Sequence, residues 1–274
     1  MPKLRQVIHH LYMSQYLEWT FVLPSLALLL LFALPIIALI WRAGGDGLFP
    51  YITQPSVISA LRLSLWTSAV SVCITILTGT PLAFVLARRK FTGKNWVELI
   101  VDLPVVLPPS VAGIALLIAF GREGVFGGWL SVMKISVPFT SAAVVIAQTF
   151  VSAPLFVRAA RIGFAEIDPQ LREAAYVEGS NEWQLFRHIL LPLAGRAILS
   201  GTVLAWTRAL GEFGATLLFA GNLEGITQTM PLAIYLGFEQ SLNIALALSF
   251  ILVLVTFMLL LVIRWLDKAK DWRM

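Results

Sequence analysis

Charged side chains are scarce in this sequence, and those whose spacing could support chemistry form two groups. One group lies in residues 172–192, REAAYVEGSNEWQLFRHILLP, where Glu173 is followed by two alanines and, later, by Gly179. The other is Arg208 with Glu212, which are four residues apart and therefore share one face of a helix, where they can form an ion pair. The charged side chains of both groups could bind other charged groups, and neither group contains the paired nucleophile and base that covalent catalysis needs.

The rest of the sequence contains no catalytic, nucleotide-binding or metal-binding pattern. His9, His10 and His188 lack metal-ligand spacing, and Cys73 is the single cysteine, which excludes a disulfide framework. The segment FTGKNW, residues 91–96, has a Gly-Lys pair but not the first glycine or the following hydroxyl of a phosphate-binding loop. We therefore expect a non-catalytic chain without a metal or cofactor of its own, which cannot hydrolyse ATP alone.

The composition indicates that most of the chain lies in lipid. Hydrophobic residues make up 58% of the 274 positions and charged residues only 13%, whereas a soluble domain has about 25% charged residues. A pI near 9.6 could indicate nucleic-acid binding. In a membrane protein, however, basic residues mark the cytoplasmic side, so we expect no nucleic-acid partner.

Six apolar stretches are long enough to cross a bilayer as helices, because a hydrocarbon core of roughly 30 Å needs about 20 residues. Unsatisfied backbone groups are costly in lipid, so the predicted fold is all-α, with six transmembrane helices. The stretches are residues 20–42, 57–87, 97–120, 137–164, 192–220 and 241–264. Pro104, Pro108 and Pro109 interrupt the third, which we expect to face protein or a pathway that satisfies the freed carbonyls.

The distribution of Lys and Arg predicts the orientation. Fifteen of the twenty basic residues fall in the two tails, after the second stretch and in the segment around the fourth and fifth stretches, whereas Arg42, Arg122 and Lys134 fall on the other side. Both termini and the stretch at 172–192 are therefore predicted to be cytoplasmic. This divides the chain into tails at 1–19 and 265–274 and a transmembrane domain, 20–264, with a cytoplasmic loop at 165–191.

Within this loop the local signals predict two short helices. Asp168 can cap the first, with Pro169 at its first position, and Gly179 can end it in a left-handed conformation. Asn181, with Gln184 three residues later, predicts the start of a second helix, which we expect Pro192 to close. By composition alone, an amphipathic hairpin lying on the membrane surface is the alternative.

A resemblance to a known family favours a different role for this loop. In residue type and spacing, this loop resembles the EAA loop of ABC importer permeases. The matching positions are Glu173-Ala174-Ala175, then Gly179 after three residues, Ile189 after nine more, and Leu191-Pro192 after one more. The resemblance implies the type I permease fold. It also implies that Glu173, Ala174, Ala175 and Gly179 attach to a separate ATPase subunit, to which ATP and Mg²⁺ bind.

Two more segments resemble molybdate and sulfate permeases of this family. They are DLPVVLPPSVAGIALL, residues 102–117, and RALGEFGATLLFAGNLEGITQTMPLAIY, residues 208–235; the TQTMPLAIY run resembles the molybdate members more. The resemblance implies import of molybdate, and of tungstate by the same route, delivered by an external binding protein to a permease homodimer in the cell's inner membrane. A sulfate or thiosulfate permease is the alternative within the family.

Several polar residues lie inside the predicted spans. Arg208 and Glu212, together with Gln148 and Thr149, could line or gate the pathway, or they could only bond helices together; Arg62 lies early in the second span. An ion-gradient-driven anion transporter would need a titratable group for ion coupling, and Glu212 already has a partner in Arg208. A channel would need a ring of selectivity residues, which the sequence does not contain.

Overall fold

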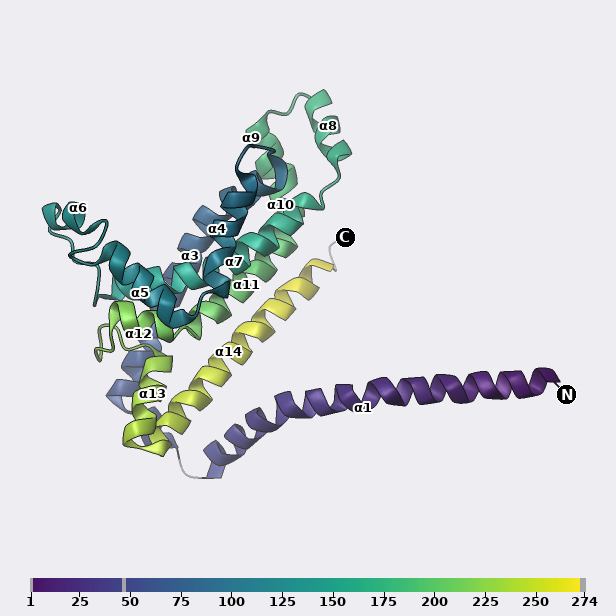
Figure 1. The fold of residues 1–274 in the computed structure, drawn as a ribbon, viewed down its shortest axis with the longest axis horizontal. Helices are drawn as coiled ribbons and strands as arrows, with labels where there is room; N and C mark the ends of the chain where they lie inside the picture. The colour runs from purple at the N-terminus through teal and green to yellow at the C-terminus, as the bar shows by residue number, and fades with distance from the viewer. Residues whose placement is uncertain (1, 46–47, 272–274) are drawn as a thin grey trace. The chain divides into compact units, whose positions relative to one another are not determined.

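The computed structural model describes the backbone of residues 2–45 and 48–271, and side chains from residue 20 to 261 apart from 44–47 and 49. Every regular element in the described residues is a helix. The chain forms two units, residues 1–49 and 50–274. The first consists mainly of α1 (Pro2–Gly45), which continues the first predicted span back through the N-terminal tail (Figure 1).

The second unit begins within α2 (Phe49–Ile52) and contains the remaining helices. They are α3 (Pro55–Arg88), α4 (Lys94–Val106), α5 (Pro109–Phe120), α6 (Gly127–Val132), α7 (Ser141–Ala165), α8 (Pro169–Val177), α9 (Glu182–Leu185), the π-helix η1 (Phe186–Leu190), α10 (Leu191–Leu193), α11 (Gly195–Leu210), α12 (Gly214–Ala220), α13 (Met230–Gln240) and α14 (Leu242–Asp271). Within this unit α8 and α9 lie at one end, far from α12 and α13 (Figure 1).

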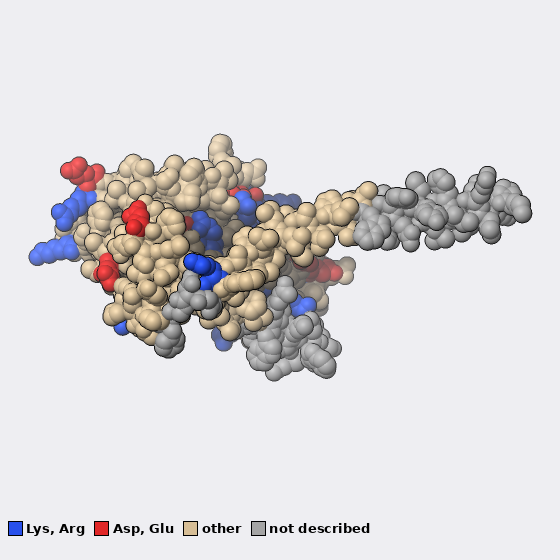
Figure 2. Space-filling model, turned by 90° about the horizontal axis from the view of Figure 1, so that it is seen from below, with Lys and Arg blue, Asp and Glu red and all other residues tan. Residues whose placement is uncertain are grey.

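Four single helices in the described residues are long and apolar enough to cross a membrane, and two bent helix pairs raise the number to six. The single helices are Thr20–Ala43, Pro55–Arg88, Ser141–Ala165 and Leu242–Leu261, which match the first, second, fourth and sixth predicted stretches. The prediction of a membrane-spanning, all-α chain is thus confirmed. Figure 2 shows a face of the molecule on which charged side chains are sparse among uncharged ones.

The third and fifth predicted spans are not continuous helices. The chain bends by 119° between α4 and α5, with Leu107 and Pro108 between the two helices. The bend lies at Pro108 and Pro109. Pro104, by contrast, lies inside α4 and does not interrupt it. In the fifth span, the chain bends by 67° between the helices over Glu182–Leu193 and Gly195–Leu210. A second interruption, from Gly211 to Phe213, separates α11 from α12.

The helix that begins at Glu182 ends at Leu193, one residue beyond Pro192, where the sequence predicts its end. A π-turn precedes the proline, and in it the N–H of Leu191 donates to the carbonyl of Phe186, five residues earlier. This wider turn relieves the clash between a proline ring and the preceding turn that would otherwise end an α-helix.

The core of the second unit is a close packing of α3, α7 and α11 through small residues. A methyl group at Gly163 of α7 would lie only 2.3 Å from Ala197 Cβ of α11, so no larger residue fits there. Hydrogen bonds join the same helices, because Trp206 Nε1 donates to Ser68 Oγ at 3.0 Å. The small side chains let the backbones approach closely, which gives helices in lipid their packing energy.

Candidate functional site

The loop between α7 and α11 has the two-helix structure that its sequence predicts. Asp168 caps α8, since its Oδ1 accepts a hydrogen bond of 2.9 Å from the N–H of Gln170. After α8, Gly179 has a φ of +84°, a left-handed conformation that glycine adopts without strain. Gly179 N–H donates to Tyr176 O at 3.0 Å, which closes the turn. The glycine therefore sets the angle at which the chain leaves α8.

The second helix starts with a complete capping box. Asn181 Oδ1 accepts from the N–H of Gln184, and Gln184 Oε1 accepts from the N–H of Asn181, both at 2.9 Å. Two backbone donors that the first turn of the helix leaves free are thereby satisfied. The start of the helix is fixed by residues that are adjacent in sequence, which explains why the pattern predicts it correctly.

Apolar side chains attach the loop firmly to the transmembrane helices. Phe186 packs edge-on against Phe84 of α3, with ring centroids 5.1 Å apart, and also contacts Phe164 of α7. Leu185, Leu190 and Ala175 are buried in the same cluster, and Ile189 and Leu191 pack against it. Rotation or displacement of the loop must therefore move the adjoining ends of α3 and α7 with it, because close-packed interiors transmit strain.

The opposite surface of the loop is unusually apolar for a polar segment. Val177 is 89% exposed, Trp183 65% and Leu171 48%. Glu173, Ala174, Gly179 and Pro192 are exposed as well, whereas Ala175 faces inward. The helical spacing of Leu171, Ala174 and Ala175 predicts a common face, but the structure divides these residues between outside and core. Exposed apolar side chains beside charged ones are typical of a surface that another protein covers.

One hydrogen bond joins the two helices of the loop on this exposed side. The hydroxyl of Tyr176 in α8 donates to Glu182 Oε1 in α9 at 2.7 Å. This bond to the carboxylate, with smaller contributions from desolvation and from the negative charge of Glu182, raises the pKa of the Tyr176 hydroxyl above its ordinary value. The contact spans the turn at Gly179 and helps to fix the angle between the helices.

Arg208 and Glu212 form the predicted pair. Arg208 Nη1 lies 2.7 Å from Glu212 Oε2, although no guanidinium N–H points at that oxygen with hydrogen-bond geometry, so the contact is an ion pair by proximity. The carboxylate is 1% exposed and the arginine side chain 33% exposed. Oε1 of Glu212 accepts from the N–H of Ala215 at 2.8 Å, at the start of α12. The pair therefore lies where the fifth span breaks.

The two polar residues predicted on α7 have different surroundings. Thr149 Oγ1 lies 3.0 Å from Ser71 Oγ, which joins α7 to α3. Gln148 is 1% exposed, and neither polar atom of its side-chain amide has a hydrogen-bond partner among the described residues. Thr149 thus bonds helices together, while Gln148 is a buried amide of the kind that water commonly satisfies in proteins.

Comparison with known proteins decides the family. The model of the family described as "Binding-protein-dependent transport system inner membrane component" matches residues 79–272, which include the whole two-helix loop. The chain belongs to this family. It is therefore a membrane-embedded, non-catalytic permease subunit of an ABC importer, whose ATPase is a separate subunit.

The relatives of this permease include both oxyanion types expected from the sequence. It is 43% identical to the probable transport system permease NifC of Clostridium pasteurianum over 86% of this chain and 83% of the relative. It is 42% identical to the molybdenum transport system permease ModB of Mycobacterium bovis over 89% and 92%. Identity to the sulfate permease CysT of Escherichia coli is 33% over 77% of each chain. The predicted resemblance to molybdate permeases is confirmed.

A solved structure confirms the type I permease fold. A bacterial ABC transporter chain involved in alginate import superposes with a TM-score of 0.75, at 20% sequence identity, over 93% of this chain and 96% of that one. Its identity is too low to carry more than the fold.

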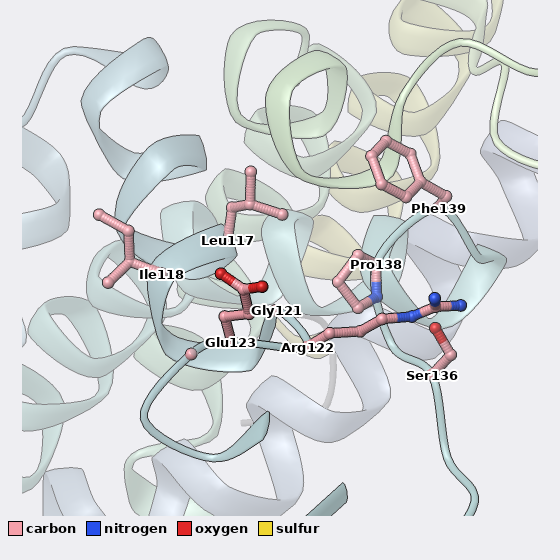
Figure 3. Close-up of a pocket in the computed structure, with 9 residues that line it drawn as sticks. Leu117, Ile118, Gly121, Arg122, Glu123, Ser136, Pro138 and Phe139 are labelled. Carbon is pink, nitrogen blue, oxygen red and sulfur yellow. The ribbon is translucent and has the colours of Figure 1, made fainter. Parts of the chain in front are cut away.

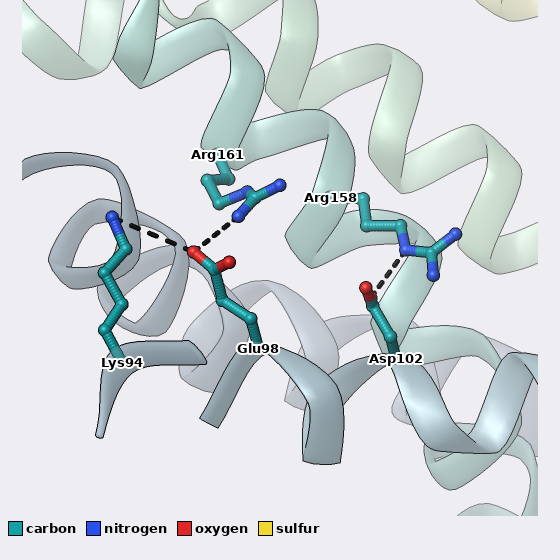
Figure 4. A network of polar contacts seen from close by, with 5 residues as sticks. All are labelled: Lys94, Glu98, Asp102, Arg158 and Arg161. Carbon is teal, nitrogen blue, oxygen red and sulfur yellow. Dashed lines mark hydrogen bonds and ion pairs between the residues drawn. The ribbon is translucent and has the colours of Figure 1, made fainter. Parts of the chain in front are cut away.

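Sequence reasoning missed an ion-pair network that holds α4 of the permease to α7. Arg158 Nε donates to Asp102 Oδ1 at 2.6 Å, and Arg161 Nη1 lies 2.6 Å from Glu98 Oε1 (Figure 4). Lys94 Nζ lies 3.8 Å from the same oxygen of Glu98. The detectable signal was two acids four residues apart on the third span and two arginines three residues apart on the fourth.

A wide cavity in the described part of the chain lies away from every predicted site residue. It measures about 640 Å³ and is lined by α5 and the following loops, including Arg122, Glu123, Ser136 and Phe139 (Figure 3). Arg122 and Glu123 have opposite charges and both lie at this cavity. No single charge dominates it, so it has no evident preference for an anion.

Proposed function

We propose that this permease is the membrane subunit of an ATP-driven molybdate importer, which also admits tungstate. Two copies form the transmembrane pathway, two ATPase subunits bind their two-helix loops, and an external binding protein delivers the oxyanion. Both termini and the loops face the cytoplasm. ATP and Mg²⁺ bind the ATPase subunits, and this chain contributes no cofactor site.

The observation that carries the coupling role is the two-sided construction of the loop. One side is buried against α3 and α7 through the cluster around Phe186, and the other exposes Leu171, Val177 and Trp183. Glu173, Ala174 and Gly179, at the positions that resemble the family's ATPase-binding motif, are also exposed. A part that is fixed to the spans and open to a partner can transmit displacement, because the packed contacts cannot deform continuously.

The order of the relatives supports molybdate over sulfate. Relatives that are named for molybdenum transport reach 42% identity, against 33% for sulfate permeases. Both substrates are tetrahedral dianions, so charge alone does not separate them, and we assign the selection between them to the binding protein. A sulfate importer remains the second candidate because the same fold and loop would serve it equally well.

Uptake in proteoliposomes tests the function directly. The permease is reconstituted with an ATPase and a binding protein encoded beside it, and radiolabelled molybdate and sulfate are supplied in turn. We expect ATP-dependent accumulation of molybdate that tungstate inhibits, and little accumulation of sulfate. Preferential sulfate uptake would support the second candidate, and accumulation that follows an ion gradient without ATP would contradict the proposal.

Two variants test the loop in the same assay. We expect Glu173→Lys and Gly179→Val to lower molybdate uptake per ATP hydrolysed, because they alter charge and backbone angle at the proposed ATPase contact. Glu123→Lys is the matched control, since this exposed acid lies between α5 and α6, outside the loop. Unchanged coupling in both loop variants would refute the assignment of the ATPase contact.

A further inference from the structure

A second cavity, at the N-terminal ends of α3 and α7, has the composition of an anion site. It measures about 460 Å³ and is lined by Ser59, Arg62, Leu63, Trp66, Ser141 and Gly225. None of these residues is acidic, and the hydroxyl groups of two serines accompany one guanidinium group. The cavity differs in this respect from the one in Figure 3, where Glu123 lies beside Arg122.

Arg62 is the unusual group in this cavity. Among the described residues Arg62 has no ion pair or hydrogen bond, and the Ser59 hydroxyl has none either. The Ser59 hydroxyl faces Gly225, because a methyl group built on that glycine would lie 3.8 Å from it. By contrast, Arg158 and Arg161 of α7 and Arg208 of α11 are paired with carboxylates. Arg88, at the other end of α3, also has guanidinium nitrogens without a hydrogen-bond partner among the described residues, but these are buried and do not line this cavity. An unpaired cation at the edge of a low-dielectric region attracts an anion strongly.

The wall opposite α3 is held rigidly in place. The carbonyl of Leu223 accepts from the N–H groups of Ile226, Thr227 and Gln228, and Thr227 Oγ1 accepts from Leu223 N–H. Ser141 Oγ donates to Ile226 O at 2.7 Å, which joins this loop to α7. A wall with this many internal bonds is preorganised, so little ordering accompanies binding of a small ion.

The cavity lies at the opposite membrane surface from the two-helix loop. Arg62 precedes Arg88 by 26 residues in the continuous helix α3, so at 1.5 Å per residue the two are about 39 Å apart. This exceeds the roughly 30 Å of the hydrocarbon core. If Arg88 is at the cytoplasmic surface, as the proposed orientation requires, then Arg62 is at the outer mouth.

We propose that Arg62 and Ser59 form a receiving site for a tetrahedral oxyanion at the outer mouth of the permease. The guanidinium and the Ser59 hydroxyl donate to the anion, while Trp66 and Leu63 form an apolar wall. This inference rests on the proposed import of an oxyanion. Phosphate in a lipid headgroup has the same chemistry as the delivered anion, and the experiment separates these two sources.

Thiol protection tests the site without depending on transport. Leu63→Cys, at a lining position that donates no bond to the anion, is introduced into a Cys73→Ser background, and its rate of modification by a sulfonate-bearing thiol reagent is measured in phospholipid-free detergent. We expect millimolar molybdate to slow this rate about tenfold, and Arg62→Gln to raise the half-protecting concentration by about tenfold or more, as loss of a charged hydrogen bond implies. Arg62→Lys should retain part of the protection.

The controls make the outcomes separable. Gly128→Cys, whose side chain would meet nothing within 4 Å, should react at a rate that molybdate does not change. Protection by phospholipid nanodiscs but not by molybdate would overturn the receiving role in favour of a headgroup site. Equal rates in all conditions would overturn the anion site, even in a permease that imports molybdate. Protection in a permease that shows no ATP-dependent uptake would instead support the site and refute the proposed function.

Discussion

The two groups of charges in this permease are stabilised in opposite ways. In the two-helix loop, charged residues such as Glu173 and Glu178 lie in water-accessible positions, and the loop is held by backbone caps and a hydrophobic cluster. At the break in the fifth span, the carboxylate of Glu212 is almost fully buried and depends on Arg208 and one backbone N–H. Loss of one charge should therefore destabilise the first region little and the second region strongly.

The largest effect should come from removing the partner of the buried carboxylate. Arg208→Gln leaves Glu212 charged and without its counterion, so we expect a loss of about 3–5 kcal/mol in the free energy of unfolding. Unfolding of the purified permease by denaturing detergent measures this loss. The double variant Arg208→Gln, Glu212→Gln should recover most of the stability, because a neutral amide can still accept from Ala215.

A matched control for that effect is the pair Asp102 and Arg158. Its side chains are 38% and 43% exposed, so Arg158→Gln should destabilise the permease far less than Arg208→Gln does. Equal losses for the two arginines would show that burial does not decide the cost, and would remove the basis of the comparison.

Intermediate effects are expected at the left-handed turn of the loop. Gly179→Ala introduces a side chain where φ is +84°, which costs roughly 1–2 kcal/mol locally although nothing lies within 4 Å. We expect faster amide hydrogen exchange in α8 and α9 and an unchanged exchange rate in α3. Gly128→Ala, where φ is not positive, serves as the control and should leave exchange in the loop unaltered.

The cap of the second loop helix should show a smaller effect. Asn181→Ala removes the bond that the Asn181 side chain accepts from the N–H of Gln184 and should lower the local stability of the helix by about 1 kcal/mol. Hydrogen exchange of the amides from Glu182 to Leu185 measures this change. A loss of global stability as large as that of Arg208→Gln would contradict the view that the loop is anchored by its apolar cluster.

The smallest effect concerns the bond between Tyr176 and Glu182. Because the hydroxyl donates to the carboxylate, the pKa of Tyr176 is raised in the folded chain. The bond therefore stabilises the loop below the ordinary pKa of tyrosine, about 10, and this contribution disappears as the pH rises through the higher folded value. Protection of the α8 amides, which is the intrinsic base-catalysed exchange rate relative to their observed rate, should fall there, and Tyr176→Phe should remove this fall. An unaltered pH profile in Tyr176→Phe would exclude the bond as its cause.

Predictions from sequence were most accurate where the determining groups are neighbours in the chain. The cap at Asp168, the glycine at 179 and the box at Asn181 each depend on residues at most three positions away. The Arg208–Glu212 pair was predictable for the same reason. By contrast, the continuous fifth span was wrong, because packing and a π-turn determine where that helix bends. The break in the third span lies at Pro108 and Pro109, two of the prolines from which the sequence predicts an interruption.

By itself the sequence determined that this chain lies in a membrane, that it carries a capped two-helix loop and that it has no phosphate-binding loop, because composition and local hydrogen bonding decide these properties. Only the tertiary structure decided which face of that loop is buried and which arginines find carboxylates on another helix. It also left Arg62 without a partner among the residues that the structure describes, beside Ser59. Such pairings depend on distances between segments that are far apart in sequence, and a periodic pattern contains no information about those distances.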